Sequence, residues 1–156
     1  MTEPRDDLFA PSLETARRPG ELERPWRLSS QFWVAFFGGP LAIGVIAWLN
    51  SHRLALGART RVLIALTAAA GLALGVGLAL GIAAADLEAG GRLASGAAGV
   101  LAYGVLYRLQ KPADRVYSFY DREGKDYASL TGPGIAAALV FGIPTALAFG
   151  AVAAAN

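Results

Sequence analysis

The sequence predicts an all-helical, polytopic membrane protein in which four transmembrane helices pair into two hairpins. Apolar residues make up 54% of the 156 positions and charged residues 17%, against roughly 25% in soluble domains. Four long stretches carry no charge, and their apolar residues lack the alternation of membrane barrel strands. These patterns exclude a water-soluble globule, and the lack of cysteine excludes a disulfide-stapled domain.

The chain divides into a polar tail, residues 1–28, and a transmembrane domain, residues 29–156. The tail mixes acidic and basic residues with proline, and it has too little apolar surface to offset the entropy of ordering. We therefore expect it to be disordered. Its acidic start differs from the basic start of a signal peptide. Trp26 and Arg27, near its end, suit the membrane interface.

Four spans are expected, because roughly 20 mostly apolar residues cross about 30 Å of hydrocarbon. They are residues 31–50, 62–85, 93–107 and 134–155. The third is the shortest, so a full crossing, helped by snorkelling of Arg92 and Arg108, competes with a re-entrant or interfacial helix. Residues 108–127 are expected to form a polar loop.

The distribution of basic residues predicts the orientation of this layout only weakly. The tail and the turn after the second span carry six Lys and Arg residues, and the other two loops carry eight. The positive-inside rule then leans toward both termini lying outside the cytoplasm, which requires a charged tail to be translocated.

Small residues four apart allow membrane helices to approach closely. The second and last spans contain such spacings, and the residues predicted to pack at helix contacts are Gly71, Gly75, Gly77, Gly81, Gly142 and Gly150. A chain this rich in Gly and Ala also produces such pairs by chance. The pattern indicates a compact bundle rather than one specific dimer motif.

Two prolines interrupt the spans, and each is expected to kink or open its helix. Pro40 lies in a Phe-Gly-Gly-Pro sequence and Pro144 in a similar Phe-Gly-Ile-Pro sequence. Broken helices at corresponding places in two halves can mark the binding site of a transporter. The alternative is two ordinary proline kinks.

The sequence contains no pattern for catalysis, cofactor binding or metal binding. No Asp, Glu, Lys, Arg or His falls within the four spans, which argues against a proton relay or a charged pore. The chain lacks a nucleophile elbow, a phosphate loop and a zinc motif, and its one histidine, His52, has no ligand partner nearby in sequence. No basic stripe indicates nucleic-acid binding.

The segment from Phe36 to Ala42, followed by Asn50, Arg53 and Leu54, resembles a pattern in small uncharacterised four-span bacterial integral membrane proteins. Gln110 also fits this resemblance. It implies the same four-span layout and a location in the bacterial inner membrane, and it implies no activity.

Two kinds of function remain open. The first is a non-enzymatic structural, accessory or protein-interaction component of the membrane, with the lipid bilayer and another membrane protein or a second copy as partners. The second is a small transporter or channel subunit built by oligomerisation. An enzyme is not expected.

Overall fold

The computed structural model describes residues 23–85, 90–120 and 127–154, and these residues are helical apart from short connections. Three helical segments are long and apolar enough to cross a membrane, namely Leu28–Arg53, Ala58–Ala84 and Thr131–Val152. The all-helical class is therefore confirmed for the described residues, and three segments have the length and apolar character of membrane spans. The helix that contains the predicted third span is not among the three. Most of the predicted tail, residues 1–22, lies outside the described residues.

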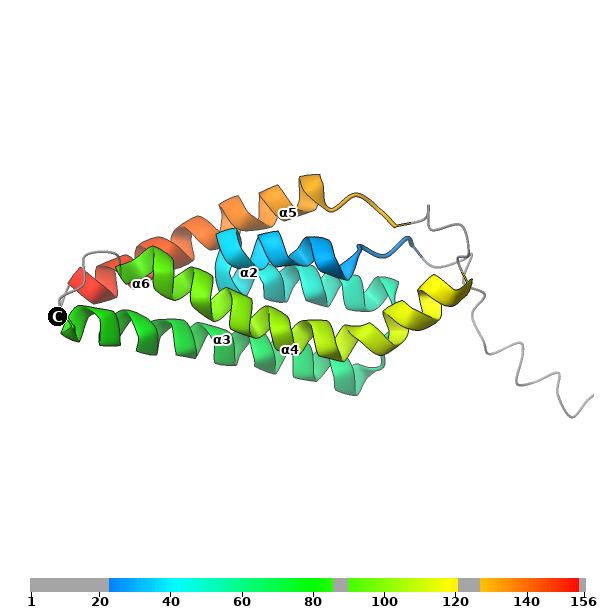
Figure 1. Ribbon diagram of the computed structural model, residues 1–156, viewed down its shortest axis with the longest axis horizontal. Coiled ribbons are helices and arrows are strands. Elements are labelled where there is room, and N and C mark those ends of the chain that lie inside the picture. The colour runs from blue at the N-terminus through cyan, green and yellow to red at the C-terminus, as the bar shows by residue number, and fades with distance from the viewer. Residues whose placement is uncertain (1–22, 86–89, 121–126, 155–156) are drawn as a thin grey trace, which may run out of the picture.

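The first helix, α2 (Gln31–Arg53), follows a short 3-10 turn, Leu28–Ser30, and folds back on itself. The backbone N–H of Trp26 donates to Oδ1 of Asn50 at 2.7 Å, across 24 residues of sequence. In one straight helix, residues 31 and 50 would lie about 28 Å apart. The five residues from 26 to 31 can reach at most about 17 Å. The helix therefore consists of two legs, residues 31–38 and 40–53, which lie side by side (Figure 1).

Gly39 forms the turn between the legs. Its φ of 72° and ψ of −169° are accessible almost only to glycine. Pro40, which has no N–H to leave unsatisfied, then begins the second leg. Residues 31–50 are thus helical and apolar, as expected, but they do not form one straight rod. The kink predicted at Pro40 is instead a reversal of chain direction at Gly39.

Three other helical runs extend along the molecule beside the hairpin (Figure 1). They are α3 (Ala58–Ala84), α4 (Gly90–Tyr120), and a composite of α5 (Thr131–Ala137), a π-helical turn η3 (Ala138–Gly142) and α6 (Ile143–Ala154). α4 runs back along α3, and the composite run then returns in the direction of α3.

α4 is much longer than the predicted third span. It includes Pro112 and continues to Tyr120, so the first part of the predicted polar loop, residues 108–120, is helical. The physical reason is visible in Figure 1, where the end of α4 projects beyond the other helices. Arg115 is exposed on this projecting end, whereas Gln110, near the start of the stretch, is buried among the other helices.

The buried interior is divided into three clusters, two of which join the hairpin to neighbouring helices. One cluster joins both legs to the segment 128–141, through Val34, Ile46 and Leu130. A second joins both legs to α3 and α4, through Ile43, Ile64 and Leu106. Beyond the tip of the hairpin, Phe149 packs with Ala79 and Ala94 in a third.

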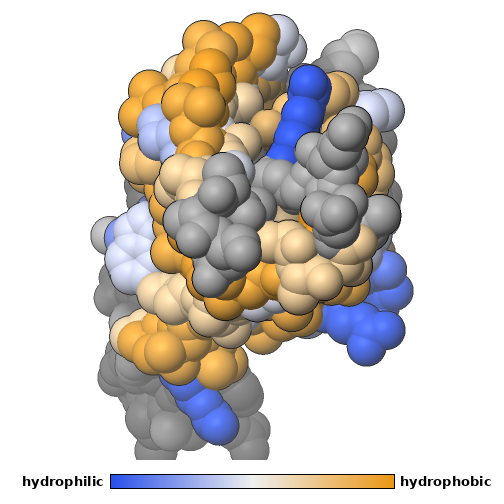
Figure 2. Space-filling view, turned by 90° about the vertical axis from the view of Figure 1, so that its left-hand side faces the viewer, coloured by the Kyte–Doolittle hydropathy of each residue, from blue (hydrophilic) through white to orange (hydrophobic). Residues whose placement is uncertain are grey.

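The outer surface of the helices is largely apolar. Figure 2 looks onto the end that holds α6 and the start of α4, and apolar residues dominate the coloured surface there. Leu66, Leu101 and Leu147 are each more than half exposed on α3, α4 and α6. Such a surface suits lipid, since soluble proteins rarely expose large contiguous apolar areas.

Candidate functional site

The tip of the hairpin is enclosed by glycines on two other helices. Gly38, Gly39 and Pro40 are all buried. A Cβ atom at Gly99 of α4 would overlap the carbonyl oxygen of Ala35, and one at Gly142 of η3 would lie 2.9 Å from the carbonyl oxygen of Gly38. These glycines let the neighbouring backbones reach the tip directly.

This packing explains how a helix can end inside an apolar bundle. The last four carbonyls of a helix have no intrahelical partner, and an unsatisfied carbonyl in a lipid-like environment costs several kcal/mol. The Cα of a glycine carries a hydrogen where other residues carry Cβ, and this hydrogen can donate a weak hydrogen bond to a carbonyl oxygen. Gly99 faces the carbonyl oxygen of Ala35 in this way. Gly96 faces the carbonyl oxygen of Phe36, which would lie 3.2 Å from a Cβ at Gly96.

Only some of the predicted packing residues lie at helix contacts. A Cβ at Gly71 would lie 2.9 Å from Pro40, and one at Gly75 would overlap the ring of Phe149. Gly142 meets Gly38. The other three predicted glycines, Gly77, Gly81 and Gly150, make no such contact within the described residues, because no described atom would lie within 4 Å of a Cβ there.

The two similar proline segments meet through these contacts. Gly38 precedes Pro40 by two residues, Gly142 precedes Pro144 by two residues, and the two glycines touch. Pro144 follows the π-helical turn η3. A proline cannot donate to the carbonyl four residues earlier, and a π turn is one way to accommodate such a gap. The widened turn places Gly142 against the hairpin tip.

A buried polar clamp, formed by Gln31, Asn50 and Gln110, joins the open ends of the two legs to α4. Nδ2 of Asn50 donates to Oε1 of Gln110 at 2.9 Å. Nε2 of Gln110 donates to Oε1 of Gln31 at 3.5 Å and to the carbonyl of Leu106 at 3.4 Å. Each of the three side chains is at most 1% exposed. Within the described residues, Nε2 of Gln31 has no partner.

Trp26 packs beside this clamp and is buried, with 3% of its surface exposed. Protein groups cover it, because its backbone N–H donates to Asn50 and the guanidinium of Arg53 lies over its ring at 4.1 Å. Arg53 also pairs with Glu23 at 3.3 Å and donates to the carbonyl of Arg24 at 2.8 Å. The chain that enters the hairpin is thereby tied to its exit.

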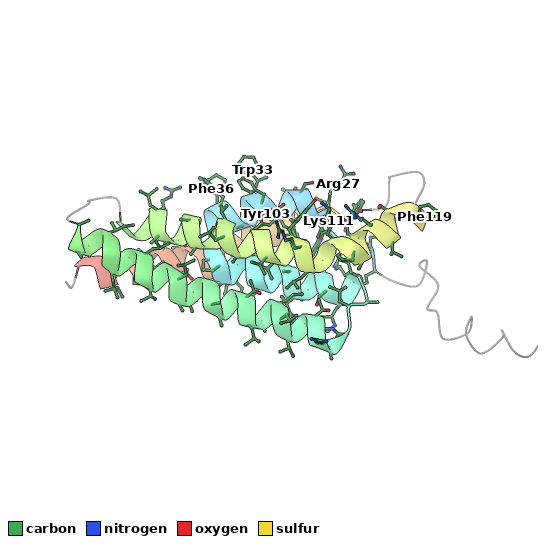
Figure 3. All side chains as sticks on the ribbon, turned by 60° about the horizontal axis from the view of Figure 1, so that its bottom comes forward. Arg27, Trp33, Phe36, Tyr103, Lys111 and Phe119 are labelled. Atoms are coloured by element: carbon green, nitrogen blue, oxygen red, sulfur yellow. The ribbon has the colours of Figure 1, made fainter. Side chains whose placement is uncertain are left out.

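A lateral groove of about 720 Å³ runs between the first leg of the hairpin and α5. One end is polar, with Arg27, Ser30, Ser129 and Thr131, and the backbone pairing of Pro25 with Ala128 lies beside it. The rest of the groove is apolar and is lined by Trp33, Val34, Phe37, Gly134, Ile135, Ala138 and Leu139. Figure 3 shows Arg27 and Trp33 on the same side of the molecule.

Three side chains organise the polar end of this lateral groove. The hydroxyl of Tyr127 donates to Oδ1 of Asp114 at 2.9 Å, and Arg27 lies over the Tyr127 ring at 5.2 Å. Burial raises the pKa of Asp114 above its ordinary value, although Tyr127 and Arg27 act in the opposite direction. Burial, together with the Asp114 carboxylate, also raises the pKa of Tyr127. The phenol therefore remains a neutral donor at physiological pH.

No known protein family, curated protein or solved structure matches the chain. Among the described residues, no group of three or more His, Asp and Glu could hold a metal ion.

The arrangement is suited to binding an amphipathic molecule along the lateral groove. The sequence predicted neither this groove nor the polar clamp. For the clamp, one signal was available, namely the amide side chains of Gln31 and Asn50 at the two ends of the first predicted span.

Proposed function

We propose that this chain is a non-enzymatic integral membrane protein of the structural or accessory class, which holds a second membrane component in its lateral groove. The observation that carries this proposal is the groove itself, which combines an apolar wall with one polar end. Its volume of about 720 Å³ falls within the roughly 300–1,000 Å³ of ligand sites, and few polar groups orient a bound molecule.

The proposal includes a membrane arrangement. α3, α4 and the run from α5 to α6 cross the bilayer, and the hairpin of α2 enters and leaves on one side. The apolar surfaces of these helices and the burial of the hairpin tip support this arrangement, because non-helical backbone at membrane depth requires cover by protein. The location is the bacterial inner membrane, as the resemblance of Phe36–Ala42 implies.

Site-specific crosslinking tests whether the groove holds a component. A photoreactive phenylalanine analogue replaces Ile135, which lines the groove and is 57% exposed, or Leu147, which is 68% exposed on α6 outside the groove. After purification in mild detergent, we expect a discrete adduct from position 135 and none from position 147. Equal crosslinking at the two positions, or none at either, would contradict the proposal.

The hairpin tip favours one second candidate, a small transporter or channel subunit assembled from several copies. Two half-helices that meet at membrane depth are a common element of transporter and channel sites. Purified protein in liposomes would then carry solute or ion flux, and Gly39→Ala would abolish it. A second copy of this chain, rather than a different membrane protein, would be the partner in that case.

A further inference from the structure

We infer that the molecule held in the lateral groove is an anionic phospholipid, with an acyl chain along the apolar wall and its phosphate beside Arg27. This inference rests on the proposed function and names the chemical class of the component. Three properties of the groove carry it, which are its polarity gradient, its depth and the charge around its polar end.

The polarity gradient matches that of a lipid. Hydroxyl groups and one guanidinium lie at a single end, from Ser30, Ser129, Thr131 and Arg27, and only apolar residues follow toward the hairpin tip. A lipid presents the same order, with phosphate and glycerol oxygens at one end and a hydrocarbon chain behind them. Hydroxyl and guanidinium groups donate hydrogen bonds to phosphate oxygens.

The depth of the groove matches one leaflet. From Thr131 to Leu139 a helix rises about 12 Å, and the groove ends near the buried hairpin tip. The hydrocarbon of one leaflet is about half of the roughly 30 Å core. A transmembrane helix of another protein would need a groove along the whole bundle. The shorter groove therefore favours an acyl chain over a protein helix.

The charge at this end favours an anion. At the end of the bundle where the polar part of the groove lies, the described residues include two acidic side chains, Glu23 and Asp114, and eight basic ones, of which only Arg27 lines the groove. The eight are Arg24, Arg27, Arg53, Arg59, Arg61, Arg108, Lys111 and Arg115. Asp114 already accepts the Tyr127 hydroxyl. Basic pockets between membrane helices bind anionic lipid headgroups, and each nearby cation contributes about 1 kcal/mol, or roughly fivefold in affinity.

The test compares lipids with equal acyl chains. The full chain is purified with equal amounts of phosphatidylglycerol and phosphatidylcholine, and the retained lipids are counted by native mass spectrometry. Arg27→Gln is matched with Arg59→Gln, an exposed cation at the same end that lies outside the groove lining. Ile135→Trp, which fills the groove, is matched with Leu147→Trp. Circular dichroism and size-exclusion chromatography check that each variant is folded.

We expect the unmodified chain to retain phosphatidylglycerol preferentially and Arg27→Gln to lower that preference roughly fivefold. Ile135→Trp should reduce retention of both lipids, and neither control should change them. An unchanged lipid ratio in Arg27→Gln, or a protein retained in the groove instead, would overturn this inference while the groove proposal stands. If Ile135→Trp retains both lipids as well as Leu147→Trp does and the Ile135 crosslink is absent, the proposed function itself fails.

Discussion

Asn50 is the residue on which the closed hairpin depends most. It accepts the N–H of Trp26 and donates to Gln110, and all these groups are buried. Asn50→Leu leaves a buried donor and a buried acceptor without partners, so we expect the free energy of unfolding to fall by about 1–3 kcal/mol. Denaturant titration in detergent, followed by circular dichroism, measures this loss.

Gln31→Leu is the matched control for that prediction. It removes the one amide donor of the polar clamp that lacks a partner within the described residues, and Gln110 keeps its bond to the carbonyl of Leu106. Its effect should stay below about 1 kcal/mol, because an unsatisfied donor disappears together with a long hydrogen bond. Equal losses for both variants would show that packing, and not the hydrogen-bond network, holds the hairpin.

Gly39 is the position where a single methyl group should matter most. Its backbone lies in a region that other residues enter at a cost of about 1–3 kcal/mol, and a Cβ there would overlap the hydroxyl of Ser95. We expect Gly39→Ala to lower the midpoint of thermal unfolding. Gly77→Ala, in the middle of α3 with open space around it, should instead raise the midpoint through a helix-propensity gain of up to about 1 kcal/mol.

Asp114 should give the protein a pH-dependent stability at acidic pH. Its folded pKa lies above the ordinary 3.8, so just above pH 3.8 the folded chain binds more protons than the unfolded chain. Stability contributed by this group is therefore greatest at low pH and declines as the pH rises through the folded pKa. Asp114→Asn still accepts from Tyr127 but cannot titrate. Its unfolding midpoint should decline less over this range than that of the unmodified chain, and identical slopes would contradict the assignment.

At the scale of helices, the sequence predicted where the apolar elements lie but not how the first one folds. Length and absence of charge locate α2, α3 and the last helical run, because crossing hydrocarbon requires both. The hairpin depends on non-local contacts. Gln31 and Asn50 meet on Gln110, and Gly99 admits the carbonyl of Ala35. Gly39 and Pro40 mark a break locally, but no pattern within residues 31–50 shows that the two legs fold back on each other.

The difference between local patterns and non-local contacts also explains which of the predicted glycines lie at helix contacts. Spacing by four residues places glycines on one face of a helix, but it does not say whether a neighbour covers that face. Gly71 and Gly75 face Pro40 and Phe149, whereas Gly77 and Gly81 have the same spacing on a face without described neighbours. The lateral groove was also beyond prediction, because it requires the first leg to lie beside α5.

The docking of the hairpin onto the last helical run gives an element-scale prediction. Gly142→Leu places a side chain where the backbone of Gly38 lies, so it should separate the tip from η3 and lower the unfolding midpoint by several degrees. Gly150→Leu, in the same helical run and with nothing described within 4 Å, should leave the midpoint nearly unchanged. A similar loss for both would mean that Gly142 is not a specific contact.

At the scale of the whole molecule, the fold-back of α2 changes the distribution of charge. A straight first span would place the residues before it opposite the α2–α3 connection. The hairpin returns them to the same end, where α4 also finishes (Figure 1). Of the nine described Lys and Arg residues, eight then lie at this end and Arg92 lies at the other. The positive-inside rule, nearly balanced in the layout expected from sequence, now favours this end in the cytoplasm.

Because the chain has no cysteine, single substitutions can report this orientation without a background signal. Glu23→Cys and Gly57→Cys lie before and after the hairpin, and Arg92→Cys lies near the start of α4. With a membrane-impermeant maleimide on intact spheroplasts, we expect only Arg92→Cys to react, and the other two to react after permeabilisation. If Glu23→Cys reacted together with Arg92→Cys, residues 31–50 would cross the membrane after all. If Glu23→Cys and Gly57→Cys both reacted from outside, the hairpin would stand and the orientation would be reversed.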